Sequence, residues 1–155
     1  MTYSEIAKPT TDTYLSKANF GDKVVDNFAH LYALRDVPIY VPLNGSVPLV
    51  NGDVQYQRVP AKFDGGTIVA VAAACHDPST NGAVVITIKN GATTILSTNI
   101  TLDQGISDTL NATVPAVIDT AHDDVEEGDL LEISVVSAGT GVTFCGVEIT
   151  FRPAD

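Results

Sequence analysis

Residues 130–152 read LLEISVVSAGTGVTFCGVEITFR, and apolar and polar side chains alternate through most of this stretch. Glu132 and Ser134 separate apolar residues in the first half, and Glu148 and Thr150 do so in the second. The alternating apolar positions are Leu131, Ile133, Val135, Val147, Ile149 and Phe151. A period of two places one face of a strand on the core and the other in water. The stretch therefore predicts two β-strands, Leu130–Ser137 and Val142–Arg152, and an all-β fold.

Residues 54 onward give further strands at the spacing of a sandwich. The other expected strands are Val54–Pro60, Thr67–Cys75, Val84–Lys89, Thr93–Leu102 and Asp108–Val114, with a break near Thr98 left open. Asn90-Gly91 is a two-residue turn of the kind that joins hairpin strands. Trp is absent, so we expect a core of Val, Ile, Leu and Ala. Seven or eight strands favour a jelly-roll-like antiparallel β-sandwich over residues 54–155.

The segment before this domain has a different pattern. Residues 20–32 read FGDKVVDNFAHLY, and Phe20, Val24, Phe28 and Leu31 recur at the spacing of one helix face. Residues 36–53 read DVPIYVPLNGSVPLVNGD, and prolines at this density exclude a central strand and fit an extended linker or an edge segment. We therefore expect residues 1–53 to form an N-terminal arm with one amphipathic helix and a Pro-rich crossing, which attaches the β domain to a partner.

Charge is distributed unevenly between these two parts. The net charge is −11, yet residues 1–35 hold four acids and four bases, so the remainder carries all of it. An acidic body repels phosphate backbones and anionic lipid, which argues against nucleic-acid and membrane partners. No apolar run approaches the ~20 residues of a membrane span, and Met1–Glu5 lacks the basic start of a signal peptide. We expect synthesis in the cytoplasm without export.

No residue pattern points strongly to catalysis or to metal binding. Cys75, His76 and Asp77 resemble a nucleophile set, but Cys75 has no cationic neighbour that would lower the pKa of its thiol. Both cysteines are expected to be free and buried. The acidic residues Asp123, Glu126, Glu127 and Asp129 could bind calcium or form a surface turn. We expect no enzyme activity, no cofactor and no metal.

Two segments are apolar on both faces. Residues 68–75 read IVAVAAAC, and Val142 and Phe144 lie on the face opposite to Cys145 and Val147. A bulge at Gly146 could bring both halves of the last strand onto one face, or another subunit could cover the outer face. The second alternative predicts self-association through Val69, Val71, Ala73, Val142 and Phe144.

The order of parts resembles small virion proteins of tailed bacteriophages. The resemblance rests on the helix in KVVDNFAHLY (23–32), the Pro-rich crossing, and the strand sequences GGTIVAVAAACHDPSTNGAVVITIKNG (65–91) and EEGDLLEISVVSAGTGVTFCGVEITFRP (126–153). It implies a displayed β domain, an N-terminal segment docked on the particle, and no catalytic residues. The proteins that share this order of parts are capsid decoration (cement) proteins, head fibres and tail appendages, which are often trimeric.

The resemblance favours a homotrimeric decoration protein that binds the major capsid protein, or another virion protein, on the head surface and stabilises the head. The alternative is a tail or head-fibre appendage that recognises a host glycan through loops 77–82 and 138–141. A third possibility, a secreted carbohydrate-active sandwich, would require an export signal that the sequence does not show.

Overall fold

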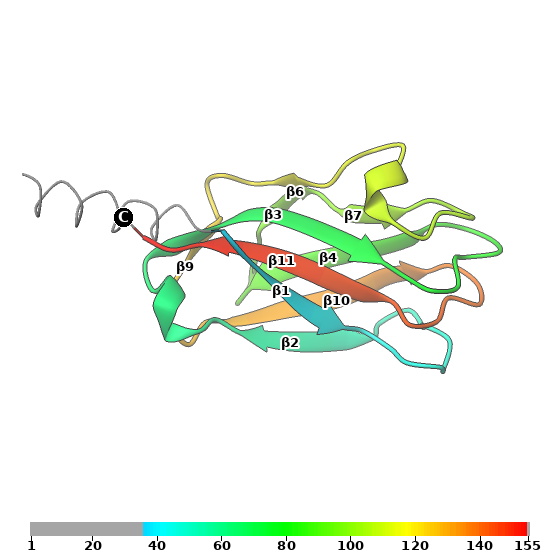
Figure 1. The fold of residues 1–155 in the computed structure, drawn as a ribbon, viewed down its shortest axis with the longest axis horizontal. Helices are drawn as coiled ribbons and strands as arrows, with labels where there is room; N and C mark the ends of the chain where they lie inside the picture. The colour runs from blue at the N-terminus through cyan, green and yellow to red at the C-terminus, as the bar shows by residue number, and fades with distance from the viewer. Residues whose placement is uncertain (1–35, 155) are drawn as a thin grey trace, which may run out of the picture. The chain divides into compact units, whose positions relative to one another are not determined.

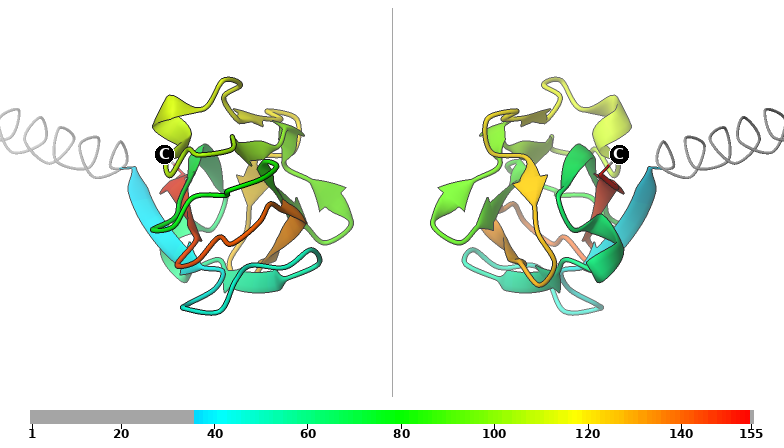
Figure 2. Two further views of the ribbon diagram at one scale, coloured as in Figure 1. Left: turned by 90° about the vertical axis from the view of Figure 1, so that its right-hand side faces the viewer. Right: turned by 90° about the vertical axis from the view of Figure 1, so that its left-hand side faces the viewer.

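Curled antiparallel sheets surround a shared apolar core in residues 36–154, the part of the chain that the computed structural model describes (Figure 1). The first sheet has the order β1-β11-β3-β9, and the second has the order β2-β10-β4-β5, with β7 also paired to β4. A third, small sheet joins β6 to β8. The end-on views of Figure 2 show the sheets curving around a common interior. The all-β prediction is confirmed for this part of the chain.

The first sheet uses β1 (Val37–Pro42), β11 (Gly146–Arg152), β3 (Gly66–Ala74) and β9 (Asp124–Val125). The second uses β2 (Val54–Arg58), β10 (Leu130–Ala138), β4 (Val84–Asn90), β5 (Thr93–Thr94) and β7 (Ile100–Leu102). The small sheet uses β6 (Leu96–Thr98) and β8 (Val117–Ile118). Two single-turn 3₁₀ helices, η2 (Ala61–Phe63) and η3 (Thr109–Asn111), lie in the connections. The break that the sequence left open near Thr98 is present, because β6 ends there and β7 begins at Ile100.

The core is mostly Val, Ile, Leu and Ala, as expected, and it also contains two phenylalanines that the expected core did not include. Its largest fully buried side chains are Phe63, Phe151, Ile68, Ile86, Ile88, Ile95, Ile100, Leu102, Leu131, Ile133, Ile149 and Val59. Phe63 of η2 stacks on Phe151 of β11, with ring centroids 4.8 Å apart. This stacked pair fixes η2 against the first sheet at one end of the core.

The Pro-rich crossing is part of the β domain. β1 pairs antiparallel with β11 from Val37↔Phe151 to Pro42↔Gly146, and Val41, Leu43 and Leu49 are buried in the core. The backbone N–H and C=O groups of the odd-numbered residues of β1 point toward β11, and those of the even-numbered residues point away from it. Pro38 and Pro42 are even-numbered, so their missing N–H groups remove no hydrogen bond from the ladder. The alternative of an edge segment is therefore the one that occurs, and the domain start expected at residue 54 is too late. Phe20, Val24, Phe28 and Leu31, the residues of the predicted N-terminal helix, lie outside the described residues.

The strand predicted at Asp108–Val114 is wrong. Asp108 instead caps η3, because its Oδ1 accepts the Leu110 N–H at 2.8 Å. The Thr113 N–H donates to Asp103 Oδ2 at 2.7 Å. These side-chain carboxylates satisfy backbone donors locally and so replace a ladder partner. Leu110 is 88% exposed as a result.

Candidate docking surface

The outer face of the first sheet is built from small and apolar residues. The ladders pair Glu148 of β11 with Tyr40 of β1 on one side and with Ala72 of β3 on the other. Cross-strand partners share a face, and the neighbouring Val147 and Ile149 are buried, so this row points outward. The residues of the outer face are Pro38, Tyr40, Pro42, Ala70, Ala72, Ala74, Gly146, Glu148 and Thr150.

A register shift in β3 decides which of its residues belong to this face. Thr150 pairs with Ala70 but Phe151 pairs with Ile68, so Val69 is an extra residue in β3. The extra residue reverses the phase of the strand beyond it. Val71 therefore packs half-buried against the core and Ala73 is buried, while Ala70, Ala72 and Ala74 face outward. The predicted self-association residues Val71 and Ala73 therefore lie on the core side of β3 and not on its outer face. Val69 is half-buried at the bulge.

The segment before β11 also differs from the prediction. Val142 and Cys145 are both fully buried, so Val142 cannot form part of an exposed self-association surface. The reversal that brings both inward occurs at Phe144, whose φ is +48°, and not at a bulge at Gly146. Regular pairing starts only at Gly146. Phe144 alone of this segment is exposed, and it lies in the loop before β11 rather than on the sheet.

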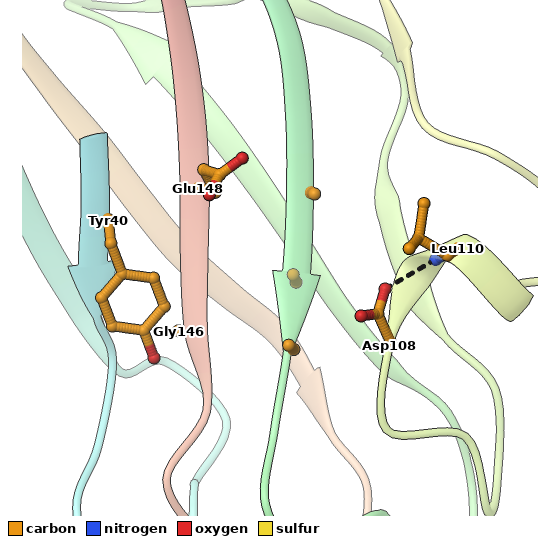
Figure 3. Close-up of a pocket in the computed structure, with 8 residues that line it drawn as sticks. Tyr40, Asp108, Leu110, Gly146 and Glu148 are labelled. Atoms are coloured by element: carbon orange, nitrogen blue, oxygen red, sulfur yellow. Dashed lines mark hydrogen bonds between the residues drawn. The ribbon is translucent and has the colours of Figure 1, made fainter. Parts of the chain in front are cut away.

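A groove of about 320 Å³ crosses the outer face (Figure 3). Its floor is made by Ala72, Ala74 and Gly146, none of which has a side chain beyond Cβ. Tyr40 forms one side, and its ring lies so close over Gly146 that a Cβ at this position would overlap it. Partial burial raises the pKa of the Tyr40 phenol, so its hydroxyl stays protonated at neutral pH.

The opposite side of the groove is η3. The Cys75 N–H donates to the Ser107 carbonyl at 2.9 Å, and the Ala73 N–H donates to Thr109 Oγ1 at 3.1 Å. These bonds fasten the segment 107–109 along the free side of β3. Leu110 is therefore held on a fixed turn beside the groove, with most of its side chain in water.

The groove carries negative charge. Asp108 and Glu148 line it, and none of the cations of residues 36–154 does. Three of the four Lys and Arg side chains in this part of the chain have contacts elsewhere: Lys89 lies 3.8 Å from Glu132, Arg152 lies 2.8 Å from Asp36, and Lys62 lies over the Phe63 ring. The fourth, Arg58, belongs to β2 of the second sheet. The surface thus combines an apolar floor with carboxylates at its sides.

A second group of polar residues lies among the loops that follow β1, β3 and β10, at the right-hand end in Figure 1. His76 Nδ1 lies 2.9 Å from Asp77 Oδ1, and the Thr143 hydroxyl donates to Asp77 Oδ2. These bonds lower the pKa of the Asp77 carboxyl, with the Thr143 bond the larger cause. The exposed Phe144 ring meets the His76 ring edge-on at 6.1 Å between centroids.

The geometry does not support Cys75 as a nucleophile. Burial, and then the charge of Asp77, raise the pKa of its thiol, whereas a nucleophile needs a lowered pKa. Cys145 is fully buried, and burial raises the pKa of its thiol to about 12. Both cysteines are free and buried, as the sequence predicts.

The acidic run 123–129 serves mainly to fasten loops. Asp129 Oδ2 accepts from Asn90 Nδ2 at 2.6 Å and from the Glu126 N–H at 3.1 Å. The Glu127 N–H donates to Asp64 Oδ1 at 2.9 Å. Within residues 36–154, no three His, Cys, Asp or Glu side chains are arranged to hold a metal ion. In the same part of the chain, no helix has the length and apolarity needed to cross a membrane.

Sequence reasoning missed Tyr40, Leu110 and Glu148 as members of one surface. The alternation of Val37, Ile39 and Val41 was a usable signal for β1, and it would have placed Tyr40 outward. No local signal marks Leu110, because its exposure depends on the Asp108 cap. No family model, curated protein or solved structure matches the chain.

Proposed function

We propose that this chain is a non-enzymatic structural protein of a tailed-phage virion, a decoration protein that attaches to the head surface and stabilises it. The proposal includes a jelly-roll connection of the strands, an N-terminal helix, and a homotrimer. It rests first on the sequence resemblance. It is supported by the nature of the exposed surface, which is a sheet face with an open groove, suited to contact with a protein, rather than an enclosed pocket suited to a small substrate.

The observation that carries the proposal is that the β domain completes its own core. Residues from Val41 to Phe151 supply a single cluster of buried apolar side chains. The apolar residues Phe20, Val24, Phe28 and Leu31 of the preceding segment are therefore free, in this proposal, to bury themselves on the major capsid protein. Covering about half of each would contribute a few kcal/mol at ~25 cal/mol per Å². Repetition over three subunits would make the attachment durable.

Co-sedimentation with particles that lack the protein tests this proposal. We expect the full chain to sediment with the particles and Phe28→Asp to lose most of this binding, because the substitution places a charge on the docking face. Asn27→Asp is the matched control, since it adds the same charge on the other helix face and should bind like the unaltered chain. Equal binding by all three proteins, or by none, would contradict the proposal.

A second candidate function is recognition of a host glycan by a tail or head-fibre appendage. It is favoured by Phe144, which is 53% exposed and lies beside His76 and Asp77. An exposed ring beside a carboxylate is a typical arrangement for stacking on a sugar and accepting its hydroxyl hydrogens. A glycan array probed with the full chain and with Phe144→Ala tests it. Binding that the substitution leaves unchanged would assign any glycan site elsewhere.

A further inference from the structure

We propose that the groove on the outer face of the first sheet binds a segment of another protein that presents a lysine or arginine flanked by small apolar side chains. The site is formed by Tyr40, Ala72, Ala74, Leu110, Gly146 and Glu148. It is separate from the N-terminal segment to which attachment was ascribed above. The inference therefore stands or falls independently of the virion role.

The shape of the groove admits a polypeptide segment. Its floor has no side chain longer than a methyl group, so an incoming side chain or backbone can approach the sheet closely. Tyr40 on β1 and Leu110 on η3 bound it on two sides (Figure 3). Both are exposed, at 57% and 88%; the Tyr40 ring lies against Gly146, and the Leu110 N–H donates to the Asp108 carboxylate. Covering the placed Tyr40 ring costs little ordering entropy on this side of the contact, and covering Leu110 adds buried apolar area.

The negative charge of the groove indicates that the partner contributes a cationic side chain. Glu148 lies in the central strand of the face, directly opposite Ala72, and Asp108 lies at the η3 side. Asp108 uses Oδ1 to cap Leu110 and keeps its other oxygen for a further donor. A guanidinium or ammonium group entering over the alanines would meet Glu148 and complete a charge-assisted hydrogen bond in a partly dry site. An acidic or uncharged segment would leave this carboxylate desolvated and unpaired.

A second copy of the chain fits this face poorly. A two-fold contact centred on the groove would bring Glu148 of each copy together, between bodies that are already strongly acidic. A head-to-tail contact, in which this face meets a different face of the next copy, would also bring together two bodies that each carry a strongly negative charge. Charge complementarity therefore selects a different, basic partner.

Strand addition at the neighbouring edge is also disfavoured. In β1 the even-numbered residues direct their backbone groups away from β11, and two of these three residues are Pro38 and Pro42. Proline has no N–H, so Tyr40 is left as the single outward donor in this strand. The partner is therefore recognised by the groove and its side chains, and not by extension of the sheet.

Selection from a random-peptide display library tests the proposal, with the full chain as bait. Before the selection, peptides that bind the variant Ala72→Lys are removed from the library. In this variant the lysine fills the groove floor and supplies a cation directly opposite Glu148. We expect the enriched peptides to carry a lysine or arginine among small apolar residues, and to bind Ala72→Lys and Glu148→Gln about tenfold or more weakly than the unaltered chain. Tyr56→Lys is the matched control: Tyr56 is also exposed and also pairs with a glutamate, Glu132, but on the second sheet. It should leave binding unchanged.

Three results would overturn the proposal. The first is failure to enrich any peptide over Ala72→Lys. The second is enrichment of peptides without a basic residue, or of peptides that bind Glu148→Gln equally well. The third is an oligomer of the unaltered chain in sedimentation equilibrium that Ala72→Lys dissociates, because the occupant would then be a second copy. None of these measurements uses particles, so their outcome is distinguishable from failure of the virion role.

Discussion

Phe144 shows how a single residue determines the shape of a loop. It is the one non-glycine residue with positive φ in residues 36–154, and it lies between two fully buried residues, Val142 and Cys145. Val142 and Cys145 are three positions apart, so an extended strand would place them on opposite faces. The left-handed conformation at Phe144 reverses the chain between them, and the Phe144 N–H is bonded to the Gly45 carbonyl at 2.9 Å. The core gains two side chains at the cost of local backbone strain.

This strain predicts an unusual order of stability for two variants. Phe144→Ala removes the ring and keeps a Cβ in the left-handed region, whereas Phe144→Gly removes both the ring and the Cβ. We expect the glycine variant to be the more stable of the two by about 1 kcal/mol, measured by urea unfolding. At a residue whose φ is negative, glycine would be the less stable choice. An alanine variant of equal or greater stability would show that position 144 is not strained.

Asp77 should make the stability of the protein depend on pH in the acidic range. Its bonds to Thr143 and His76 lower the pKa of the carboxyl in the folded state below its ordinary value of 3.8. Stability from this group is therefore complete above that value and is lost as the pH falls through the lowered folded-state pKa. We expect Asp77→Asn to lower the melting temperature at pH 7 and to lower it less at pH 3. Asp124→Asn, at an exposed residue of β9, is the control, and a constant difference across this pH range would contradict the prediction.

At the scale of the element, alternation was a sound guide where strands are long. It located β10 and β11, whose nine and seven residues give several periods. β3 was located instead as a run that is apolar on both faces. Alternation could not reveal β8 or β9, because two residues carry no period. It failed at Asp108–Val114, where alternating letters are overridden by carboxylates that cap backbone N–H groups.

The same limits apply to the docking surface. Sequence showed that β3 is apolar on both faces, but the bulge at Val69 decided which residues face outward, and that bulge is visible only in the pairing with β11. The charge at the centre of the face comes from Glu148, which sequence assigned simply to the wet side of a strand. Its position beside Tyr40 and Ala72 is set by register, which depends on contacts between segments about a hundred residues apart.

Hydrogen exchange can test the position of β1 in the sheet. The Leu43 N–H bonds to the Cys145 carbonyl at 2.9 Å, so the odd-numbered residues before it donate to β11. We expect the amide protons of Ile39 and Val41 to be strongly protected and that of Tyr40 to exchange quickly. Protection is measured residue by residue by NMR. Uniformly fast exchange across Val37–Pro42 would show that this segment does not pair with β11 and is a linker.

At the scale of the whole molecule, the described domain combines a complete core with one outer face that is open to a partner. The outer face of the second sheet also exposes apolar side chains, among them Tyr56 and Leu130, but there Lys89 lies 3.8 Å from Glu132. The first sheet exposes Tyr40 and small residues around Glu148. The two outer faces therefore differ in charge, because Glu132 has a cation partner and, among residues 36–154, Glu148 has none. Substitutions at Ala72 and Glu148, whose side chains face outward, should change binding and leave stability nearly unchanged.

Truncation from the N-terminus should reveal where the independent domain begins. A chain that starts at Asp36 keeps β1 and the Asp36–Arg152 pair, so we expect its melting temperature to lie within about 3 °C of that of the full chain. A chain that starts at Leu43 loses the six-residue ladder along β11 and uncovers the core where Val41 was buried. Its melting temperature should fall by roughly 10 °C or more, since burial of one such side chain alone contributes about 1.5–3 kcal/mol. Val41→Asp in the full chain should act in the same direction, because it places a charge in the same part of the core. If the chain that starts at Leu43 melts with the full chain, β1 adds nothing to the fold; if the chain that starts at Asp36 already melts far lower, residues 1–35 are part of the folded unit and are not free to dock elsewhere.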